Sequence, residues 1–246
     1  MFHDRDDRCI DNGSSVTLPP AGSSTSAVSC ADPNRAKTSC SVSPSVARRR
    51  LFVKRSIDII LSLALAVALL PVMLLTAVVV RLTMGRPVLF KQQRPGREGA
   101  VFTLVKFRTM VPTTATDRND DGKRITRVGR FLRATSLDEL PTLINVISGS
   151  MSLVGPRPLL IEYLDRYSPE QARRLDVRPG ITGLSQVLDR NQTTWERRLQ
   201  LDVWYVDNAG LALDLKILGK TIWRVVSRRG ISPQGHATMP EFEGND

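Results

Sequence analysis

Histidine and cysteine are scarce in this sequence, and their positions exclude several kinds of chemistry. The 246-residue chain has two histidines, His3 and His236, near its opposite ends, so a Ser-His-Asp or Cys-His mechanism is disfavoured. The three cysteines, Cys9, Cys30 and Cys40, lie within the first fifty residues without the paired spacing of a zinc site, which argues against a disulfide framework or structural zinc. Any chemistry must therefore use carboxylates, lysine and arginine, with a hard metal ion as a further candidate.

Acidic and aromatic residues are also few. The 24 acidic residues are outnumbered by 35 basic ones, which gives a net charge of +11 and a sequence pI near 10.3. This charge suits a phosphate-bearing partner, such as nucleic acid, an anionic membrane or a phosphorylated small molecule. A membrane-tethered, basic nucleic-acid-binding regulator is one alternative, but an aromatic content of 5% and the lack of a recognised reading motif disfavour it. We therefore expect no nucleic-acid partner.

One long apolar run follows a polar start. Residues 1–47 are rich in serine and proline and are predicted to be a disordered tail. Within residues 48–84, a basic flank precedes Ile59–Val80, which has no charge and would rise roughly 33 Å as a helix, enough to cross a bilayer. Pro71 predicts a kink in this helix. Because basic residues flank both ends, a re-entrant membrane helix is favoured over a spanning one.

The sequence from residue 85 to 235 is typical of a globular domain, and 41% of the chain is hydrophobic. We expect an α+β, helix-rich fold with a small sheet and interfacial amphipathic helices, followed by a flexible C-terminus at residues 236–246. The amphipathic helix at Leu211–Ser227 is predicted either to lie at a membrane surface or to cap the core. The predicted elements are a strand at Val101–Phe107, helices at Ser136–Ile147, Ser168–Leu175 and Leu211–Ser227, and a turn at residues 178–183.

The most informative stretch runs from Arg133 to Pro141. Ser136 followed three residues later by Glu139 matches a capping box, which would place Asp138 and Glu139 in the first turn of a helix. Acidic residues there commonly just stabilise the helix. A helix N-terminus also favours an ionised carboxylate and binds phosphate, so Asp138 is predicted to be deprotonated beside a phosphoryl group.

A carboxylate that attacks an anionic diphosphate needs cations around it. The cations available for substrate binding are Lys106, Arg108, Arg133 and Arg157. Arg157 stands between two prolines, which would hold its guanidinium in a set direction. A Mg²⁺ ion bridging Asp138 and phosphate would complete the set.

The sequence resembles the bacterial sugar transferases, specifically the monotopic phosphoglycosyl transferases that begin lipid-linked glycan assembly. Six short motifs occur in the family's order across roughly residues 50–235, and six together are hard to produce by chance. They are Lys54-Arg-Ser-Ile-Asp58, Gln93-Arg-Pro-Gly96, Lys106-Phe-Arg-Thr-Met110, Thr135-Ser-Leu-Asp-Glu-Leu-Pro141, Gly155-Pro-Arg-Pro158 and Arg178-Pro-Gly-Ile-Thr-Gly183.

The resemblance implies a re-entrant helix and a domain resting on the cytoplasmic face of the bacterial inner membrane. It implies that Asp138 attacks the β-phosphate of a UDP-sugar, that UMP leaves, and that undecaprenyl phosphate then takes the sugar phosphate from Asp138. Glu139 would be the second member of the dyad and would position the acceptor or the metal. Arg133 and Lys106 would contact phosphates, and Arg157 the nucleotide region.

Further features of the resemblance concern the sugar and the partners. The short form, with Tyr163 and the sequence Arg229–Thr238, is most similar to enzymes that transfer N-acetylated amino sugars such as diacetylbacillosamine. Downstream glycosyltransferases and a homodimer are the other expected partners. A non-catalytic scaffold of glycan assembly is the remaining alternative, which the intact site residues disfavour. Leu70 stands where family members often have serine before the proline, and Asp189 where a glycine is expected.

Overall fold

The computed structural model describes residues 44–111, 124–188, 194–227, 242 and 244. All of these fall in one compact unit, Val42–Asp246. Most of the predicted disordered tail, and the segment Arg229–Thr238, lie outside the described residues, as does Asp189. The last residues assigned to the tail, from Pro44 onward, are helical.

The apolar segment forms two helices that meet near Pro71, α1 (Pro44–Ala68) and α2 (Leu70–Met84). Among the described residues no single helix is long and apolar enough to cross a bilayer, whereas the pair, bent by 61°, is so by length and composition. Pro71 has no N–H to donate and stands at the start of α2, where a helix tolerates it. The predicted break is confirmed, and a re-entrant path through a membrane stays a prediction.

Helix α1 is held against the rest of the fold by polar side chains near its middle. The Asp58 carboxylate accepts a hydrogen bond of 2.7 Å from the Ser152 hydroxyl. The Lys54 ammonium donates to the Asp214 carboxylate at 2.7 Å and to the Val154 carbonyl at 3.2 Å. Because Asp58 and Asp214 are almost fully buried, these pairs tie α1 firmly to the globular part.

Two small sheets accompany the helices, so the α+β, helix-rich prediction is confirmed. Strand β1 (Leu89–Pro95) pairs antiparallel with β2 (Val101–Phe107), with Leu89 opposite Phe107, and the short 3₁₀ helix η1 (Arg97–Gly99) joins them. Strand β3 (Ser152–Val154) pairs in parallel with β4 (Gly180–Thr182). The strand predicted at residues 101–107 is confirmed, whereas part of the predicted turn at residues 178–183 is strand β4.

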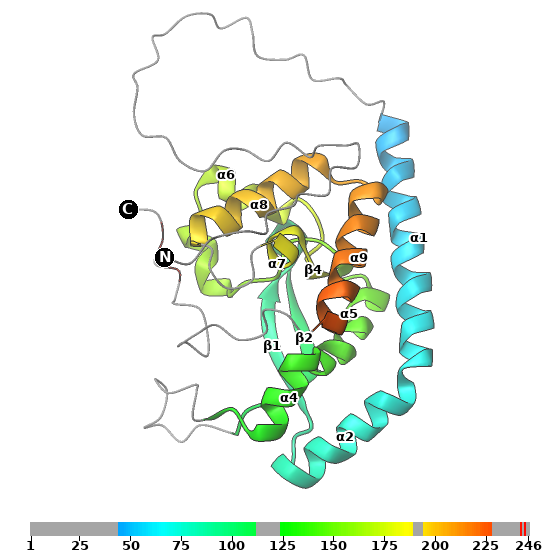
Figure 1. Cartoon of the computed structure of the whole chain (residues 1–246). Helices are drawn as coiled ribbons and strands as arrows, with labels where there is room; N and C mark the ends of the chain where they lie inside the picture. The colour runs from blue at the N-terminus through cyan, green and yellow to red at the C-terminus, as the bar shows by residue number, and fades with distance from the viewer. Residues whose placement is uncertain (1–43, 112–123, 189–193, 228–241, 243, 245–246) are drawn as a thin grey trace, which may run out of the picture. The chain divides into compact units, whose positions relative to one another are not determined.

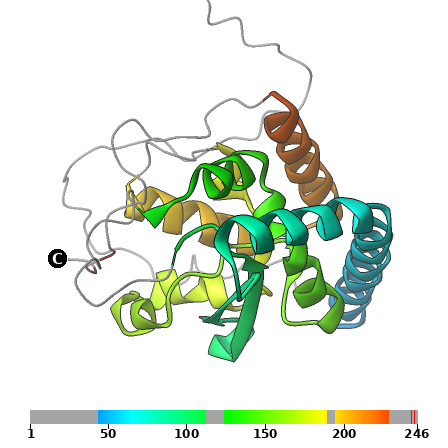
Figure 2. The same cartoon turned by 90° about the horizontal axis from the view of Figure 1, so that it is seen from below.

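Helices surround these strands, as Figure 1 shows. Two predicted helices are confirmed. The helix predicted at Ser168–Leu175 is observed as α6 (Pro169–Ala172) and η4 (Arg173–Leu175), and the helix predicted at Leu211–Ser227 is observed as α9 (Leu211–Ser227). Helix α1 runs beside α5 and α9 in Figure 1, and Figure 2, seen from below, shows α2 crossing under the other elements. The remaining elements are α4 (Arg127–Thr135), η2 (Leu137–Thr142), α5 (Leu143–Ser148), η3 (Ile161–Arg166), α6 (Pro169–Ala172), η4 (Arg173–Leu175), α7 (Leu184–Leu188), α8 (Trp195–Asn208) and α9 (Leu211–Ser227).

Helix α9 has two different apolar faces. Ile217 is 1% exposed and packs into the main core, whereas Ile222 and Trp223 are more than 60% exposed. Helices α1 and α2 likewise expose large apolar side chains. Such an extent of exposed apolar surface is uncommon on a protein surrounded by water and marks an interaction site. The largest exposures on α1 and α2 are those of Phe52, Ile60, Val67, Leu74, Leu75 and Leu82.

The C-terminal region returns to the domain at one described point. Phe242, predicted to belong to a flexible terminus, is 3% exposed. Its ring packs against those of Tyr163, Tyr167 and Trp195, with centroids 5.5 to 6.0 Å apart. This aromatic cluster forms a second, smaller core beside the main one.

Candidate active site

The turn that carries Asp138 and Glu139 begins differently from the predicted capping box. Ser136 has φ 57° and makes no side-chain capping bond, because it ends α4 in the left-handed conformation. An N-cap residue normally has extended backbone angles, so the capping-box prediction is wrong. The single helix predicted at Ser136–Ile147 is observed as two elements, the 3₁₀ helix η2 followed by α5, with Gly149 as the C-cap of α5. A serine with positive φ stores strain of the kind found at functional sites.

Side-chain hydrogen bonds hold this turn against strand β2. The Thr142 hydroxyl donates to the Val105 carbonyl at 3.0 Å. The Asn145 amide accepts from the Val105 N–H at 3.1 Å and donates to the Thr103 carbonyl at 2.8 Å. Asn145 thus pairs with the free edge of β2 as a neighbouring strand would. The pairing sets Lys106 on β2 opposite the acidic turn.

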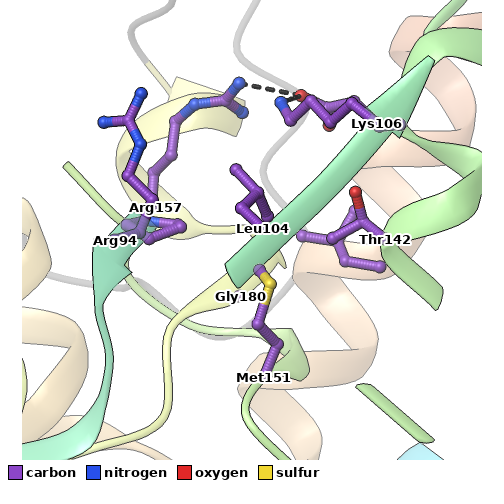
Figure 3. A pocket seen from close by; sticks show the side chains of 10 residues that line it. Arg94, Leu104, Lys106, Thr142, Met151, Arg157 and Gly180 are labelled. Atoms are coloured by element: carbon purple, nitrogen blue, oxygen red, sulfur yellow. Dashed lines mark hydrogen bonds and ion pairs between the residues drawn. The ribbon is translucent and has the colours of Figure 1, made fainter. Parts of the chain in front are cut away.

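Glu139 is held by two cations, Lys106 and Arg157, whose charged ends point toward each other in Figure 3. Its Oε1 accepts from the Lys106 ammonium at 2.6 Å and from the Arg157 guanidinium at 2.8 Å. Burial disfavours the charged form of Glu139, but Arg157 and Lys106 outweigh it and hold the pKa of this carboxyl well below its ordinary value. Glu139 is therefore a fixed anion that orients both cations.

Asp138 has a different environment from its neighbour. The side chain is buried, and among the described residues its carboxylate accepts no hydrogen bond. Burial and the charge of Glu139 raise the pKa of Asp138 to about 6, against the opposing effect of Lys106, Arg157 and Arg133. The helix end therefore does not lower this pKa, but a pKa of about 6 agrees with the predicted deprotonated state at neutral pH. At neutral pH the group is still mostly ionised, poorly solvated and free to form a bond.

The other two predicted cations, Arg133 and Arg108, have different hydrogen-bond partners. The Arg133 Nε donates to the Thr109 hydroxyl at 2.9 Å, and its charge acts on Asp138. Arg108 is 7% exposed, and its guanidinium donates to the carbonyls of Met84, Gly85 and Arg86 at the end of α2. These contacts give Arg108 a helix-capping role in place of the predicted substrate contact.

The loop that carries Arg157 is fixed by residues that the sequence did not single out. Arg174, 3% exposed, donates to the Arg157 carbonyl at 2.7 Å and to the Asp202 carboxylate at 2.7 Å. The Ser185 hydroxyl donates to the other Asp202 oxygen at 2.8 Å. A buried guanidinium and carboxylate with their hydrogen bonds satisfied hold a backbone in one position. No local sequence pattern predicts the ion pair of Arg174 with Asp202.

A pocket opens beside Glu139 and encloses about 310 Å³, including space open to solvent. Three cations, Arg94, Lys106 and Arg157, line it together with Glu139, and Asp138 stands next to this glutamate in the chain. Arg94 was part of a motif but had no predicted role. The other lining residues are Leu104, Thr142, Met151, Pro158, Gly180 and Ile181.

The side chains around the dyad offer few ligands for the predicted metal. Among residues 44–111, 124–188 and 194–227, no group of three or more acidic, histidine or cysteine side chains could hold a metal ion. Mg²⁺, however, is commonly held by one or two carboxylates together with substrate phosphates. Asp138, whose carboxylate accepts no hydrogen bond from the described residues, fits that ligand set.

Comparison with known proteins accounts for this arrangement. The family model described as bacterial sugar transferase matches residues 49–228. The chain belongs to this family. The protein named "Uncharacterized sugar transferase EpsL" from Bacillus subtilis is 47% identical over 197 residues, which cover 79% of this chain and 98% of that protein.

Two further relatives carry names that state an activity. The UDP-glucose:undecaprenyl-phosphate glucose-1-phosphate transferase of Caulobacter vibrioides is 43% identical over 183 residues, 69% of this chain and 68% of that protein. The undecaprenyl-phosphate galactose phosphotransferase of Salmonella typhimurium is 40% identical over 202 residues, 74% of this chain but only 42% of that protein. The family match and these relatives identify the chain as a phosphoglycosyl transferase.

Proposed function

We propose that this enzyme transfers a sugar 1-phosphate from a UDP-sugar to undecaprenyl phosphate and releases UMP through a covalent adduct on Asp138. The observation that carries this proposal is the contrast within the dyad. Glu139 accepts two charged hydrogen bonds, whereas the neighbouring Asp138 accepts none from the described residues and has a raised pKa. A carboxylate with a raised pKa that is still ionised at pH 7 is a stronger nucleophile than an ordinary one.

In the first step an Oδ atom of Asp138 forms a bond to the β-phosphorus of the donor. The bond from that phosphorus to the bridging oxygen breaks, and UMP leaves with this oxygen. Lys106 and Arg157, both of which contact Glu139, neutralise in this proposal the charge that gathers on the phosphates. No proton has to move in this step, which agrees with motifs that contain no histidine.

In the second step a phosphate oxygen of undecaprenyl phosphate attacks the same phosphorus. The bond to Asp138 breaks, so the carboxylate is regenerated and the product is the lipid diphosphate sugar. Two transfers through one carboxylate replace a single displacement between two anions. Mg²⁺ is proposed as the cofactor, held by Asp138 and phosphate oxygens, and it would supply charge neutralisation at the phosphates.

We further propose that the enzyme sits on the cytoplasmic face of the bacterial inner membrane. The bent pair of α1 and α2 and the outward apolar face of α9, with Ile222 and Trp223, support this placement. A re-entrant path fits the cationic residues Lys54 and Arg81, one on each side of the bend. Cysteine labelling of positions before α1 and after α2 in intact cells tests it, because a spanning path would leave only one end protected.

The mechanism is tested by trapping the adduct. Purified full-length protein in detergent, with UDP-sugar and Mg²⁺ but no lipid acceptor, should gain the mass of one sugar phosphate on Asp138 and release one equivalent of UMP. Asp138→Asn should do neither, and Asp207→Asn, at an exposed ion pair with Arg173, should behave as the wild type. Wild-type turnover with no trapped adduct, or a normal rate of UMP release by Asp138→Asn, would rule out the covalent step.

The donor sugar is addressed by a screen. The named relatives act on UDP-glucose and on galactose, whereas the sequence resemblance predicts an N-acetylated amino sugar. We expect UMP release to be fastest with an N-acetylated donor in a panel of UDP-glucose, UDP-galactose, UDP-N-acetylglucosamine and UDP-diacetylbacillosamine. Faster release with either plain hexose would contradict the amino-sugar proposal and leave the reaction class intact.

A further inference from the structure

Arg94 lines the pocket and forms no ion pair with a described residue, although the charge of Glu162 acts on it from beyond ion-pair distance. Its guanidinium donates to the Gln92 amide oxygen at 2.7 Å, and its buried Nε has no hydrogen-bond partner among the described residues. A half-buried guanidinium with an unused donor is costly unless something else accepts from it.

The hairpin places Arg94 on the same face as Lys106. Arg94 stands opposite Phe102 in the β1–β2 pairing, and Lys106 opposite Phe90. Opposite residues share a face and side chains alternate along each strand, so both cations point to the same side. Four residues of strand separate the two pairs, which corresponds to roughly 13 Å along the hairpin.

The three cations of the pocket lie at different distances from the Asp138–Glu139 dyad. Lys106 and Arg157 both contact Glu139 and both act on the charge of Asp138. Arg94 is not among the groups that chiefly shift the pKa of either carboxyl, and the charge of Arg157 contributes to the lowered pKa of Arg94, after the effect of burial. In Figure 3 the Arg157 guanidinium lies between the Arg94 guanidinium and the Lys106 side chain. Two adjacent arginines with no described acid between them fit an anion that bridges them.

We propose that Arg94 binds the phosphate of the nucleoside monophosphate half of the donor, the group that leaves as UMP. This inference rests on the proposed function, in which the phosphorus under attack must lie beside Asp138. The other phosphate of the diphosphate then lies farther from the dyad, on the side of the pocket where Arg94 is found. Gln92 holds the guanidinium in place, and the other terminal N–H groups of the guanidinium donate to the phosphate oxygens.

The experiment compares the binding of UMP and of uridine to full-length protein in detergent by calorimetry. Arg94→Gln should weaken UMP binding about tenfold to hundredfold, as expected for the loss of a charged hydrogen bond to an ion, and should leave uridine binding unchanged. Arg94→Lys keeps the charge but loses the paired donors of the guanidinium, so its affinity for UMP should lie between that of the wild type and that of Arg94→Gln. Arg97→Gln is the matched control, because Arg97 carries the same charge on the same hairpin but is exposed and paired with Glu98.

The outcomes separate this inference from the proposed function. Unchanged UMP binding in Arg94→Gln, or an equal loss of UMP and uridine binding, would overturn the assignment of Arg94. So would a raised KM for undecaprenyl phosphate with unchanged UMP binding, because it would place Arg94 at the acceptor. In each case adduct formation on Asp138 in the wild type would still stand, whereas a wild type that forms no adduct would refute the covalent mechanism instead.

Discussion

Replacing Asp138 by asparagine should stabilise the fold near neutral pH while it abolishes the adduct. In the folded protein, burial and Glu139 raise the pKa of Asp138 from its ordinary 3.8 to about 6. A carboxyl with a raised pKa binds its proton more tightly when the protein is folded, so ionisation destabilises the fold as pH rises through this interval. Asparagine cannot ionise and removes that cost.

The magnitude follows from the pKa. The difference between 3.8 and about 6 corresponds to about 3 kcal/mol at pH 7.5, since each pH unit is worth about 1.4 kcal/mol. About half of this remains at pH 5, and it vanishes only well below pH 3.8. For a domain of this size, about 3 kcal/mol would raise the Tm by roughly 6–12 °C, which we regard as an upper bound.

Thermal unfolding of the wild type and the variant in the same detergent, at pH 7.5 and pH 5, measures the effect. We expect Asp138→Asn to melt several degrees higher at pH 7.5 and to lose about half of that advantage at pH 5. Asp207→Asn removes an exposed acid paired with Arg173 and should shift the Tm very little at either pH.

A lower Tm for Asp138→Asn would refute this reasoning. It would mean that the carboxylate stabilises the start of η2, as an acidic residue in a first helical turn usually does. An equal gain at both pH values would also contradict it, because the cost of ionisation must depend on pH in this range.

The remaining predictions concern the rate and the supports of the site. Single-turnover adduct formation should fall about tenfold for each pH unit below the pKa of Asp138, about 6, and a flat pH–rate profile down to pH 5 would contradict the role of its ionised form. Asp202→Asn leaves Arg174 buried without its counter-charge and should lower the unfolding free energy by about 3–5 kcal/mol, measured by denaturant titration. Asn145→Leu removes both side-chain bonds to β2 and should lower kcat about tenfold or more with KM for the donor nearly unchanged, because Lys106 loses its position; an unchanged kcat would contradict this.

The sequence by itself determined the features that depend on near neighbours. Pro71 breaks the apolar helix because proline lacks an N–H group, whatever surrounds it. The alternation of Val101–Phe107 and the helical spacing of Leu211–Ser227 led to the correct strand and helix. The six ordered motifs were enough to identify the family, because each is a short run of neighbouring residues.

Only the tertiary structure decided how the charged residues divide their roles. Arg108 and Arg133 have the same chemistry, but one caps α2 and the other acts on Asp138. Asp138 and Glu139 are adjacent in sequence, and their pKa values move in opposite directions. The physical reason is that burial and ion pairing depend on groups such as Lys106 and Arg157, which are distant in the chain and meet the dyad only after folding.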